Sequence, residues 1–277
     1  MKPTDLPVVV GIDGSDAAIN AALWAIDEAV VRDVPLRLVA AVPLSDLRGS
    51  SDTHGPESQY AETALRAATA AALAAGKPVK VETAIEPANP QDLLIDESHS
   101  AAMICVGSVG INRFAANMLG STAQAVANGA HCPVAIIRSR AGSSGPTDQP
   151  SAHQSWVVAA INELSDCDDV LELGFAEAAL RNTGLIAVVM PWWTEDAERN
   201  SLMDATIDNW SARHPGVPVQ TWIASRSLAE FIADSEDSVQ LVVVGRADAH
   251  QVSRLVGPVD GLSHFDHNDC SVLVTRH

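Results

Sequence analysis

Residues Ala102–Ala127 read AMICVGSVGINRFAANMLGSTAQAVA, and this stretch indicates how the first half of the chain folds. Its opening apolar run, Ala102–Val106, is typical of a buried strand, and Ala123–Ala127 is typical of a helix. Glycines stand between the two at positions 107, 110 and 120. A glycine-rich loop that leads into a helix N-terminus lets backbone amides approach an anion closely. The stretch therefore predicts a strand, an anion-binding loop and a helix.

Two common phosphate-binding motifs do not fit this loop. Walker A requires Gly-Lys-Ser/Thr, and the dinucleotide fingerprint requires Gly-x-Gly-x-x-Gly near the chain start. The spacing from Gly107 to Thr122 is instead Gly-x2-Gly-x9-Gly-Ser-Thr, which resembles the signature of the ATP-binding universal stress proteins. Val8–Ser15 (VVVGIDGS) is similar to the opening strand of that family, and His131–Ile137 (HCPVAII) is similar to its closing strand. The chain is identified as a member with two such domains in tandem.

The resemblance implies a fold, a ligand and a role. It implies the strand order 3-2-1-4-5, and ATP with Mg²⁺ in a crevice above the first sheet. It also implies a role in stress response, dormancy or growth control, with the nucleotide as a signal or structural ligand. The candidate cofactor-binding residues are Asp13, Gly14, Ala41, Val42, Gly107, Gly110, Arg113, Gly120, Ser121 and Thr122. The assignment of Ala41 and Val42 to the adenine edge depends on the resemblance alone.

Several of these residues also have chemical reasons to be in a site. Asp13 follows a run of valines, and a carboxylate at the end of a first strand faces the ligand crevice of a doubly wound sheet. The alternative for Asp13 is a helix N-cap, for which Ser15 and Asp16 compete. Ser121 can cap the next helix and offer a hydroxyl to a phosphate. Arg113 can reach phosphates or remain a solvated loop arginine.

The composition limits the classes of partner. The chain has 277 residues, of which 47% are hydrophobic and only 4% aromatic, a balance that suits parallel sheets built from small aliphatic side chains. The formal net charge of -18 argues against nucleic acids and anionic membranes as partners. An adenine nucleotide site in such a chain needs local amides and a divalent cation. No motif identifies a protein partner.

The cysteines and the hydropathy predict a cytoplasmic protein. The four cysteines form no CxxC pair and indicate neither a disulfide framework nor a zinc site. No apolar run approaches the roughly 18 residues that span a bilayer, and no charged-then-apolar N-terminal leader is present.

Strands and helices alternate along both halves of the chain. Strand-like runs are Val8–Ile12, Leu36–Val42, Val79–Ile85, Met103–Val106 and Val134–Ile137, then Trp156–Ile161, Leu185–Met190, Val217–Ile223, Val239–Val244 and Ser271–Thr275. Helical segments in the first half are Ala17–Val31, Ala61–Ala75 and Pro90–Ser98. This alternation predicts an α/β fold class with two tandem, doubly wound, parallel five-stranded sheets.

A segment without periodicity separates the two sheets. Residues 141–154 are rich in glycine, serine and proline and are predicted to be a linker. The predicted domains are residues 1–140, with the intact ATP-binding motif, and residues 155–277.

The second domain is a degenerate repeat of the first. Val79–Ile85 aligns without gaps to Val217–Ile223, and the same offset carries Gly107 onto Gly245. In the second copy Asp13 becomes Asn162, Gly14 becomes Glu163, Gly110 becomes Asp248, Gly120 becomes Pro258 and Ser121 becomes Val259. Carboxylates at two of these positions would repel phosphates. We therefore expect a structural, dimer-forming or regulatory role for the second domain.

No catalytic residue is predicted. The sequence has no Gly-x-Ser-x-Gly elbow, and its nine histidines show no metal-binding spacing on a helix. Because a general base and a phosphate-reaching lysine are missing, we expect no enzyme, or at most a very slow ATPase. The open alternatives are a slow ATPase or related nucleotidyl-transfer enzyme, a cyclic AMP-binding module and an interaction protein with a vestigial site. The long loop and Ser121 favour a triphosphate.

The closing strands predict a homodimer. Val134–Ile137 and Val272–Val274 are short and apolar, and the inferred strand order places each at a sheet edge. An exposed apolar edge promotes aggregation unless it is covered or paired, and a two-fold axis pairs each edge with its own copy. The alternative is that the two edges pair within one chain.

Overall fold

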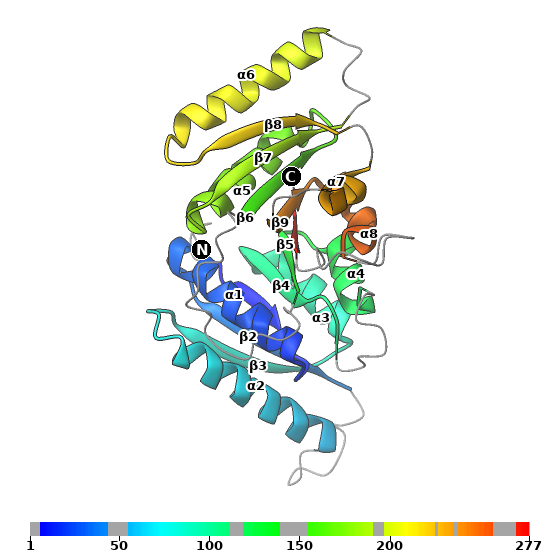
Figure 1. The fold of residues 1–277 in the computed structure, drawn as a ribbon. Coiled ribbons are helices and arrows are strands. Elements are labelled where there is room, and N and C mark those ends of the chain that lie inside the picture. Colours follow the sequence, from blue (N-terminus) through cyan, green and yellow to red (C-terminus); the bar gives the residue numbers. More distant parts are fainter. Residues whose placement is uncertain are drawn as a thin grey trace. The chain divides into compact units, whose positions relative to one another are not determined.

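The computed structural model describes residues 6–43, 55–110, 119–138, 155–190, 197–224, 227–234, 238–256 and 270–276. The chain forms two compact units, Met1–Ser139 and Arg140–His277. Each unit is a parallel sheet with helices (Figure 1). The predicted linker, Arg113, Pro258 and Val259 lie outside the described residues.

The first unit is a doubly wound sheet. Its elements are β1 (Val8–Gly11), α1 (Asp16–Arg32), β2 (Leu36–Val42), α2 (Pro56–Ala74), β3 (Val81–Pro87), α3 (Pro90–Glu97), a short 3-10 helix (Ser98–Ser100), β4 (Met103–Gly107), α4 (Ser121–Gly129) and β5 (Val134–Ile137). The strands are all parallel and lie in the order β3-β2-β1-β4-β5. The predicted fold class and strand order are confirmed.

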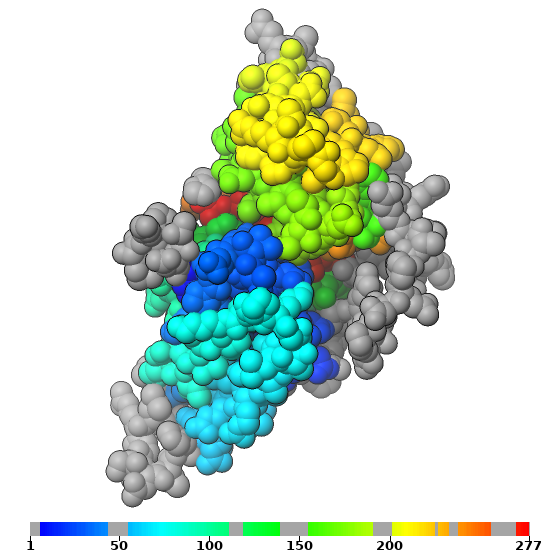
Figure 2. Space-filling view, turned by 90° about the vertical axis from the view of Figure 1, so that its left-hand side faces the viewer, coloured from blue at the N-terminus to red at the C-terminus, as the bar shows by residue number. Residues whose placement is uncertain are grey.

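Strand positions follow from the apolar runs, because a parallel sheet covered on both faces buries every side chain of its central strands. The side chains of Val8–Val10 and of Met103–Cys105 are completely buried. Helices α1 and α2 pack together on one face, and α3 and α4 pack together on the other. Figure 2 shows α1 and α2, blue and cyan, forming the outer surface of this unit on one side.

Local signals set the helix ends. Ser15 caps α1, since its hydroxyl accepts a hydrogen bond from the amide of Ala18 at 3.1 Å. After α2, Gly76 adopts a left-handed φ of 66°, as expected for a glycine that terminates a helix. No helix among the described residues is long and apolar enough to cross a bilayer.

The second unit repeats this arrangement. Its elements are β6 (Ser155–Ile161), α5 (Cys167–Leu180), β7 (Gly184–Val189), α6 (Ala197–Arg213), β8 (Val219–Ile223), α7 (Leu228–Asp234), β9 (Ser238–Val244), a 3-10 helix (Arg246–Gln251), α8 (Val252–Val256) and β10 (Ser271–Val274). The parallel strands lie in the order β8-β7-β6-β9-β10, the order of the first unit.

A buried ion pair appears at matching places in the two units. Glu28 on α1 pairs with Arg32, and Glu177 on α5 pairs with Arg181, each one helical turn apart. Both glutamate side chains are almost completely buried, which is rare for a carboxylate unless it is paired. The repeated pair supports a duplication as the origin of the two units.

The closing strands are core elements. Ile136 on β5 and Val272 on β10 are completely buried. A lysine at either position would bury a charge and destabilise the fold. The homodimer interface at the closing strands stays a prediction.

Candidate functional site

The candidate site lies at the carboxyl ends of β1 and β4. The chain moves from β1 outward to β2 and β3, then returns to the other side of β1 with β4. Doubly wound sheets bind ligands at this reversal of strand order. Residues 13–15 follow β1 here, and residues 108–110 follow β4.

Asp13 presents an exposed carboxylate to this crevice. Its Oδ1 accepts hydrogen bonds from the amide of Ser15 at 2.9 Å and from the Ser15 hydroxyl at 2.6 Å. Since Ser15 caps α1, Asp13 has no capping role there. A Cβ atom added to Gly110 would lie 2.9 Å from Asp13 Oδ2. Glycine at position 110 therefore leaves room for the carboxylate beside the second loop.

Gly14 brings an unpredicted residue to the crevice. Its φ of 85° favours glycine, and a Cβ there would lie 2.4 Å from the Tyr60 hydroxyl. Tyr60 lies on α2, is 47% exposed and is the only tyrosine in the chain. Sequence reasoning missed it because α2 is remote in sequence from both loops and no motif includes it.

Gly107 and Gly120 have different structural roles. A Cβ on Gly107 would lie 2.8 Å from the backbone carbon and the Cβ of Ala17, so glycine lets α1 pack against the end of β4. Among the described residues, a Cβ on Gly120 would meet nothing closer than the Ser108 carbonyl oxygen, at 3.5 Å. Packing against these residues does not require glycine at position 120, and a methyl group there would occupy space above the loop.

The N-terminus of α4 closes the loop. The Gly120 amide donates a hydrogen bond to the Ser108 carbonyl at 2.8 Å, and Gly120 is the N-cap of α4 without a side-chain hydrogen bond. Ser121 is therefore the first helical residue, and the expectation that it caps the helix is wrong. Ser121 is exposed and Thr122 is half-buried. Because Gly120 has no side chain with which to cap α4, the first-turn amides of this helix can donate hydrogen bonds to an anion.

The end of β2 forms the third side of the crevice. Ile12 donates its amide to the Val39 carbonyl at 2.8 Å, so Val39 directs its backbone groups toward β1. Because backbone groups alternate along a strand, Ala41 also points toward β1, which ends at Gly11. The Val42 carbonyl instead accepts a hydrogen bond from Ala88 on the other side. Ala41 is thus the residue whose backbone faces the crevice.

The corresponding crevice of the second unit is filled by its own side chains. A Cβ on Gly245 would lie 2.6 Å from Asp166 Oδ2, so this carboxylate occupies the space beside the loop. Asp248 is only 7% exposed, and its carboxylate accepts a hydrogen bond from the Gln251 side chain at 3.0 Å. Asn162, which replaces Asp13, also bonds to Asp248.

Burial raises the pKa of Asp248. The neighbouring carboxylates of Asp166 and Glu163 raise it further, while the Asn162 hydrogen bond and His250 act in the opposite direction. A phosphate would meet these carboxylates directly. The loss of nucleotide binding in this copy stays a prediction.

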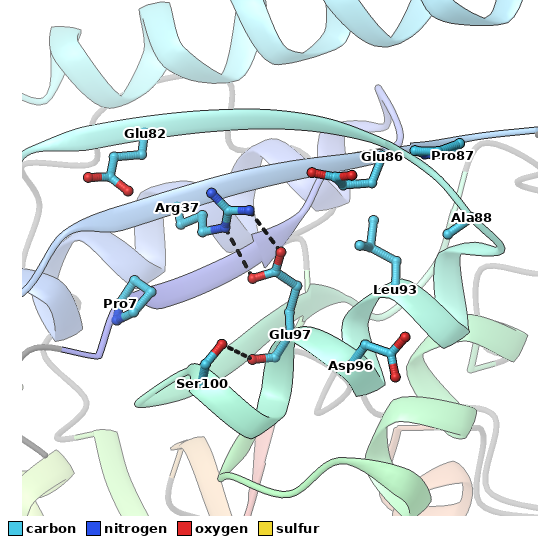
Figure 3. Close-up of a pocket in the computed structure, with 10 residues that line it drawn as sticks. All are labelled: Pro7, Arg37, Glu82, Glu86, Pro87, Ala88, Leu93, Asp96, Glu97 and Ser100. Carbon is cyan, nitrogen blue, oxygen red and sulfur yellow. Dashed lines mark hydrogen bonds and ion pairs between the residues drawn. The ribbon is translucent and has the colours of Figure 1, made fainter. Parts of the chain in front are cut away.

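A separate pocket lies on the α3 side of the first sheet (Figure 3). Arg37 and Glu97 face each other across it and form two hydrogen bonds, at 2.9 and 3.1 Å, which raise the pKa of the Arg37 guanidinium. Glu82, Glu86 and Asp96 supply further carboxylates to its lining. The one arginine is already paired, so this pocket suits no anionic nucleotide.

Comparisons with known proteins agree with this architecture. The model of the universal stress protein family matches residues 6–138. A universal stress protein of Mycobacterium tuberculosis strain H37Rv is 43% identical, over 99% of this chain and 98% of its own length. A crystal structure of a universal stress protein from Archaeoglobus fulgidus has a TM-score of 0.70 at 17% identity, covering 99% of this chain and 97% of its own. A universal stress protein solved in complex with cAMP is 27% identical over 48% of this chain and 97% of its own, with a TM-score of 0.37.

Proposed function

Because the chain belongs to the universal stress protein family, we propose that its first unit binds ATP with Mg²⁺ in the crevice beyond β1 and β4. The nucleotide serves as a signal or structural ligand in stress response, dormancy or growth control. The observation that carries this proposal is the α4 N-terminus, whose N-cap is a glycine and which is held beside the glycine loop by the hydrogen bond from the Gly120 amide to the Ser108 carbonyl.

The phosphates would lie between the glycine loop and α4. A Cβ on Gly120 would be 3.8 Å from the Gly110 amide, and a Cβ on Gly110 would be 2.9 Å from Asp13 Oδ2. Helix amides, loop amides and the Asp13 carboxylate therefore surround one space. Amides at a helix N-terminus favour phosphate, and the long loop after Gly110 gives a triphosphate more room than a cyclic monophosphate needs.

The nucleoside end would extend over β1 toward β2. The exposed Asp13 carboxylate can accept hydrogen bonds from ribose hydroxyls. The backbone of Ala41 lies beyond the end of β1, where its amide and carbonyl can pair with the adenine edge.

The available oxygen donors fit a magnesium ion that arrives with the phosphates. Among the described residues, no group of three or more His, Cys, Asp or Glu side chains could hold a metal by itself. Mg²⁺ commonly binds substrate phosphates, one or two protein oxygens and waters. Asp13, Ser121 and Thr122 can supply those protein oxygens, and the ion would offset phosphate charge in a chain of net charge -18.

We propose that ATP is bound rather than turned over, and that the protein acts in the cytoplasm. Of the candidate crevice residues that the structure describes, only Asp13 carries a charge, and it already accepts two hydrogen bonds from Ser15. Phosphoryl transfer needs cations that stabilise the transition state and a positioned base. The four cysteines are all free and buried, as suits a reducing compartment.

Calorimetry with matched variants tests the proposal. We expect one ATP site per chain. Asp13→Asn makes the first crevice resemble the second, and losing an ionic hydrogen-bond acceptor should weaken binding by about 2 kcal/mol, roughly thirtyfold. The matched control, Asn162→Asp in the second unit, should leave the affinity unchanged. Two sites per chain, wild-type affinity in Asp13→Asn, or cyclic AMP binding in place of ATP would contradict the proposal.

A further inference from the structure

The phenol of Tyr60 lies against the turn that joins β1 to α1. The three atoms nearest to the position of a Cβ on Gly14 are its Oη, Cζ and Cε1, all within 3.1 Å of that position. The tyrosine therefore meets Gly14 with the edge of the ring that carries the hydroxyl. Because this hydroxyl would have to shift for any other residue at position 14, the glycine keeps it at this point.

The packing of α2 holds Tyr60 in this position. The helix begins at Pro56 and contacts α1, β2 and β3. Ala61 and Ala64 on its inner face are buried, and Tyr60, one helical turn before Ala64, is exposed at the border of that face. Because α2 packs on β2 and Tyr60 reaches the turn after β1, the phenol covers the stretch of the crevice where we place the nucleoside.

The hydrogen-bonding groups of Asp13 and Tyr60 are complementary to a sugar hydroxyl. A hydroxyl both donates and accepts hydrogen bonds, whereas an ionised carboxylate only accepts them and a phenol can donate one. Both bonds from Ser15 end on Asp13 Oδ1, and among the described residues none ends on Oδ2. The Tyr60 hydroxyl likewise has no hydrogen-bond partner in the part of the chain that the structure describes. An acceptor and a donor are thus both open at residues 13 and 14 of one turn.

The second unit has lost every part of this arrangement. Asn162 stands in place of Asp13, and Glu163 stands in place of Gly14. Tyr60 is the only tyrosine in the chain, so the second unit has no phenol to offer. The carboxylate, the glycine and the tyrosine therefore occur together in the first unit and are absent together from the second, as expected if all three serve one ligand.

We propose that Tyr60 binds the sugar of the nucleotide and makes the first unit selective for ribonucleotides over deoxyribonucleotides. One ribose hydroxyl donates its hydrogen to Asp13 Oδ2 and accepts a hydrogen bond from Tyr60 Oη. A deoxyribose that lacks this hydroxyl leaves both protein groups unpaired, and a site built to hydrogen-bond a hydroxyl rejects an analogue without it for that reason. The inference rests on the proposed function, because it concerns the sugar of the same bound nucleotide.

Calorimetric titration with ATP, 2′-deoxyATP and 3′-deoxyATP, each with Mg²⁺, tests the inference. Wild type should bind ATP at least about tenfold more tightly than one of the two deoxynucleotides. Tyr60→Phe keeps the ring beside Gly14 and loses only the hydroxyl, so the preference for the ribose form should shrink about tenfold while the Tm stays at the wild-type value. The matched control is Thr63→Val, which removes a hydroxyl of the same helix that donates to the Gln59 carbonyl at 2.9 Å and should change neither affinity nor preference.

Nitration of the single tyrosine gives a second readout. Tetranitromethane modifies exposed tyrosines, and the four cysteines, which it also attacks, are buried. Bound ATP with Mg²⁺ should slow the nitration of Tyr60, as followed by mass spectrometry. A wild type that binds no ATP would overturn the proposed function and this inference together. ATP binding without a ribose preference, a preference that Tyr60→Phe leaves unchanged, or nitration that bound ATP does not slow would overturn this inference alone.

Discussion

Gly107→Ala should lower the stability of the fold, whereas Gly120→Ala should lower the affinity for ATP, although both glycines belong to one motif. In Gly107→Ala the new methyl group would lie 2.8 Å from the backbone carbon of Ala17, which cannot move without shifting α1. In Gly120→Ala the nearest atom would lie at 3.5 Å, and the N-cap has φ -63° and ψ 147°, which alanine adopts freely.

The contacts of each added methyl group indicate how large the loss of stability or of ATP affinity should be. Forcing a methyl group into packed backbone costs roughly 1–3 kcal/mol, which for a unit of this size lowers its Tm by roughly 3–12 °C. Replacing an N-cap glycine with alanine costs about 0.5–1 kcal/mol. The methyl group of Gly120→Ala, however, occupies space where we place the phosphates, and it should reduce ATP affinity by about 2 kcal/mol, roughly thirtyfold.

Two measurements separate the effects: thermal unfolding without ligand, and calorimetric titration with ATP and Mg²⁺ at a temperature where every variant is folded. Gly216→Ala is the control, because a Cβ there meets nothing within 4 Å. It should change neither quantity. A wild-type Tm in Gly107→Ala would refute the packing argument, and wild-type affinity in Gly120→Ala would refute the placement of the phosphates.

Two further predictions concern acid and turnover. The pKa of Asp248 is raised from 3.8 by burial, so protonation stabilises the fold: this contribution is complete below pH 3.8 and is lost as the pH rises through the folded pKa. Asp248→Asn should therefore raise the Tm of the second unit at pH 7, and its advantage over wild type should shrink toward pH 4; an advantage independent of pH would contradict this. Purified protein should hydrolyse ATP far more slowly than an ordinary enzyme, whose turnover number is about 1 s⁻¹ or more. A phosphate-release assay measures this rate. A rate of about 1 s⁻¹ that is lost in Asp13→Asn would show that the protein is an enzyme.

The strands were predictable because burial on both faces of a parallel sheet leaves an almost uninterrupted apolar run. The runs Leu36–Val42 and Val134–Ile137 match β2 and β5 residue for residue. The third strand shifts from the expected Val79–Ile85 to Val81–Pro87, because Val79 bonds to Lys77 in a turn first. Strand edges depend on such local turns, which apolarity alone does not reveal.

The site was predictable only as far as its motifs extend along one stretch of chain. Asp13 and Gly110 were expected to share a crevice, and the structure places the Asp13 carboxylate 2.9 Å from where a Cβ of residue 110 would lie. Tyr60 could not be found, because only the packing of α2 brings it to Gly14. The role of Gly107 could not be assigned for the same reason: its neighbour, Ala17, lies 90 residues away in the sequence.

Because carboxylates lie in the crevice of the second unit, a nucleotide should change the stability of the two units, and their resistance to proteolysis, by different amounts. A ligand that binds only the folded state stabilises it by RT ln(1 + [L]/Kd), about 2.7 kcal/mol at one hundred times the Kd. Under the proposed function, the first unit gains this term when ATP is abundant. Under the same proposal the second unit, which holds the carboxylates of Asp166 and Asp248 near the equivalent loop, gains no such term. When ATP falls, the first half alone loosens, so its rate of degradation would follow the energy state of the cell.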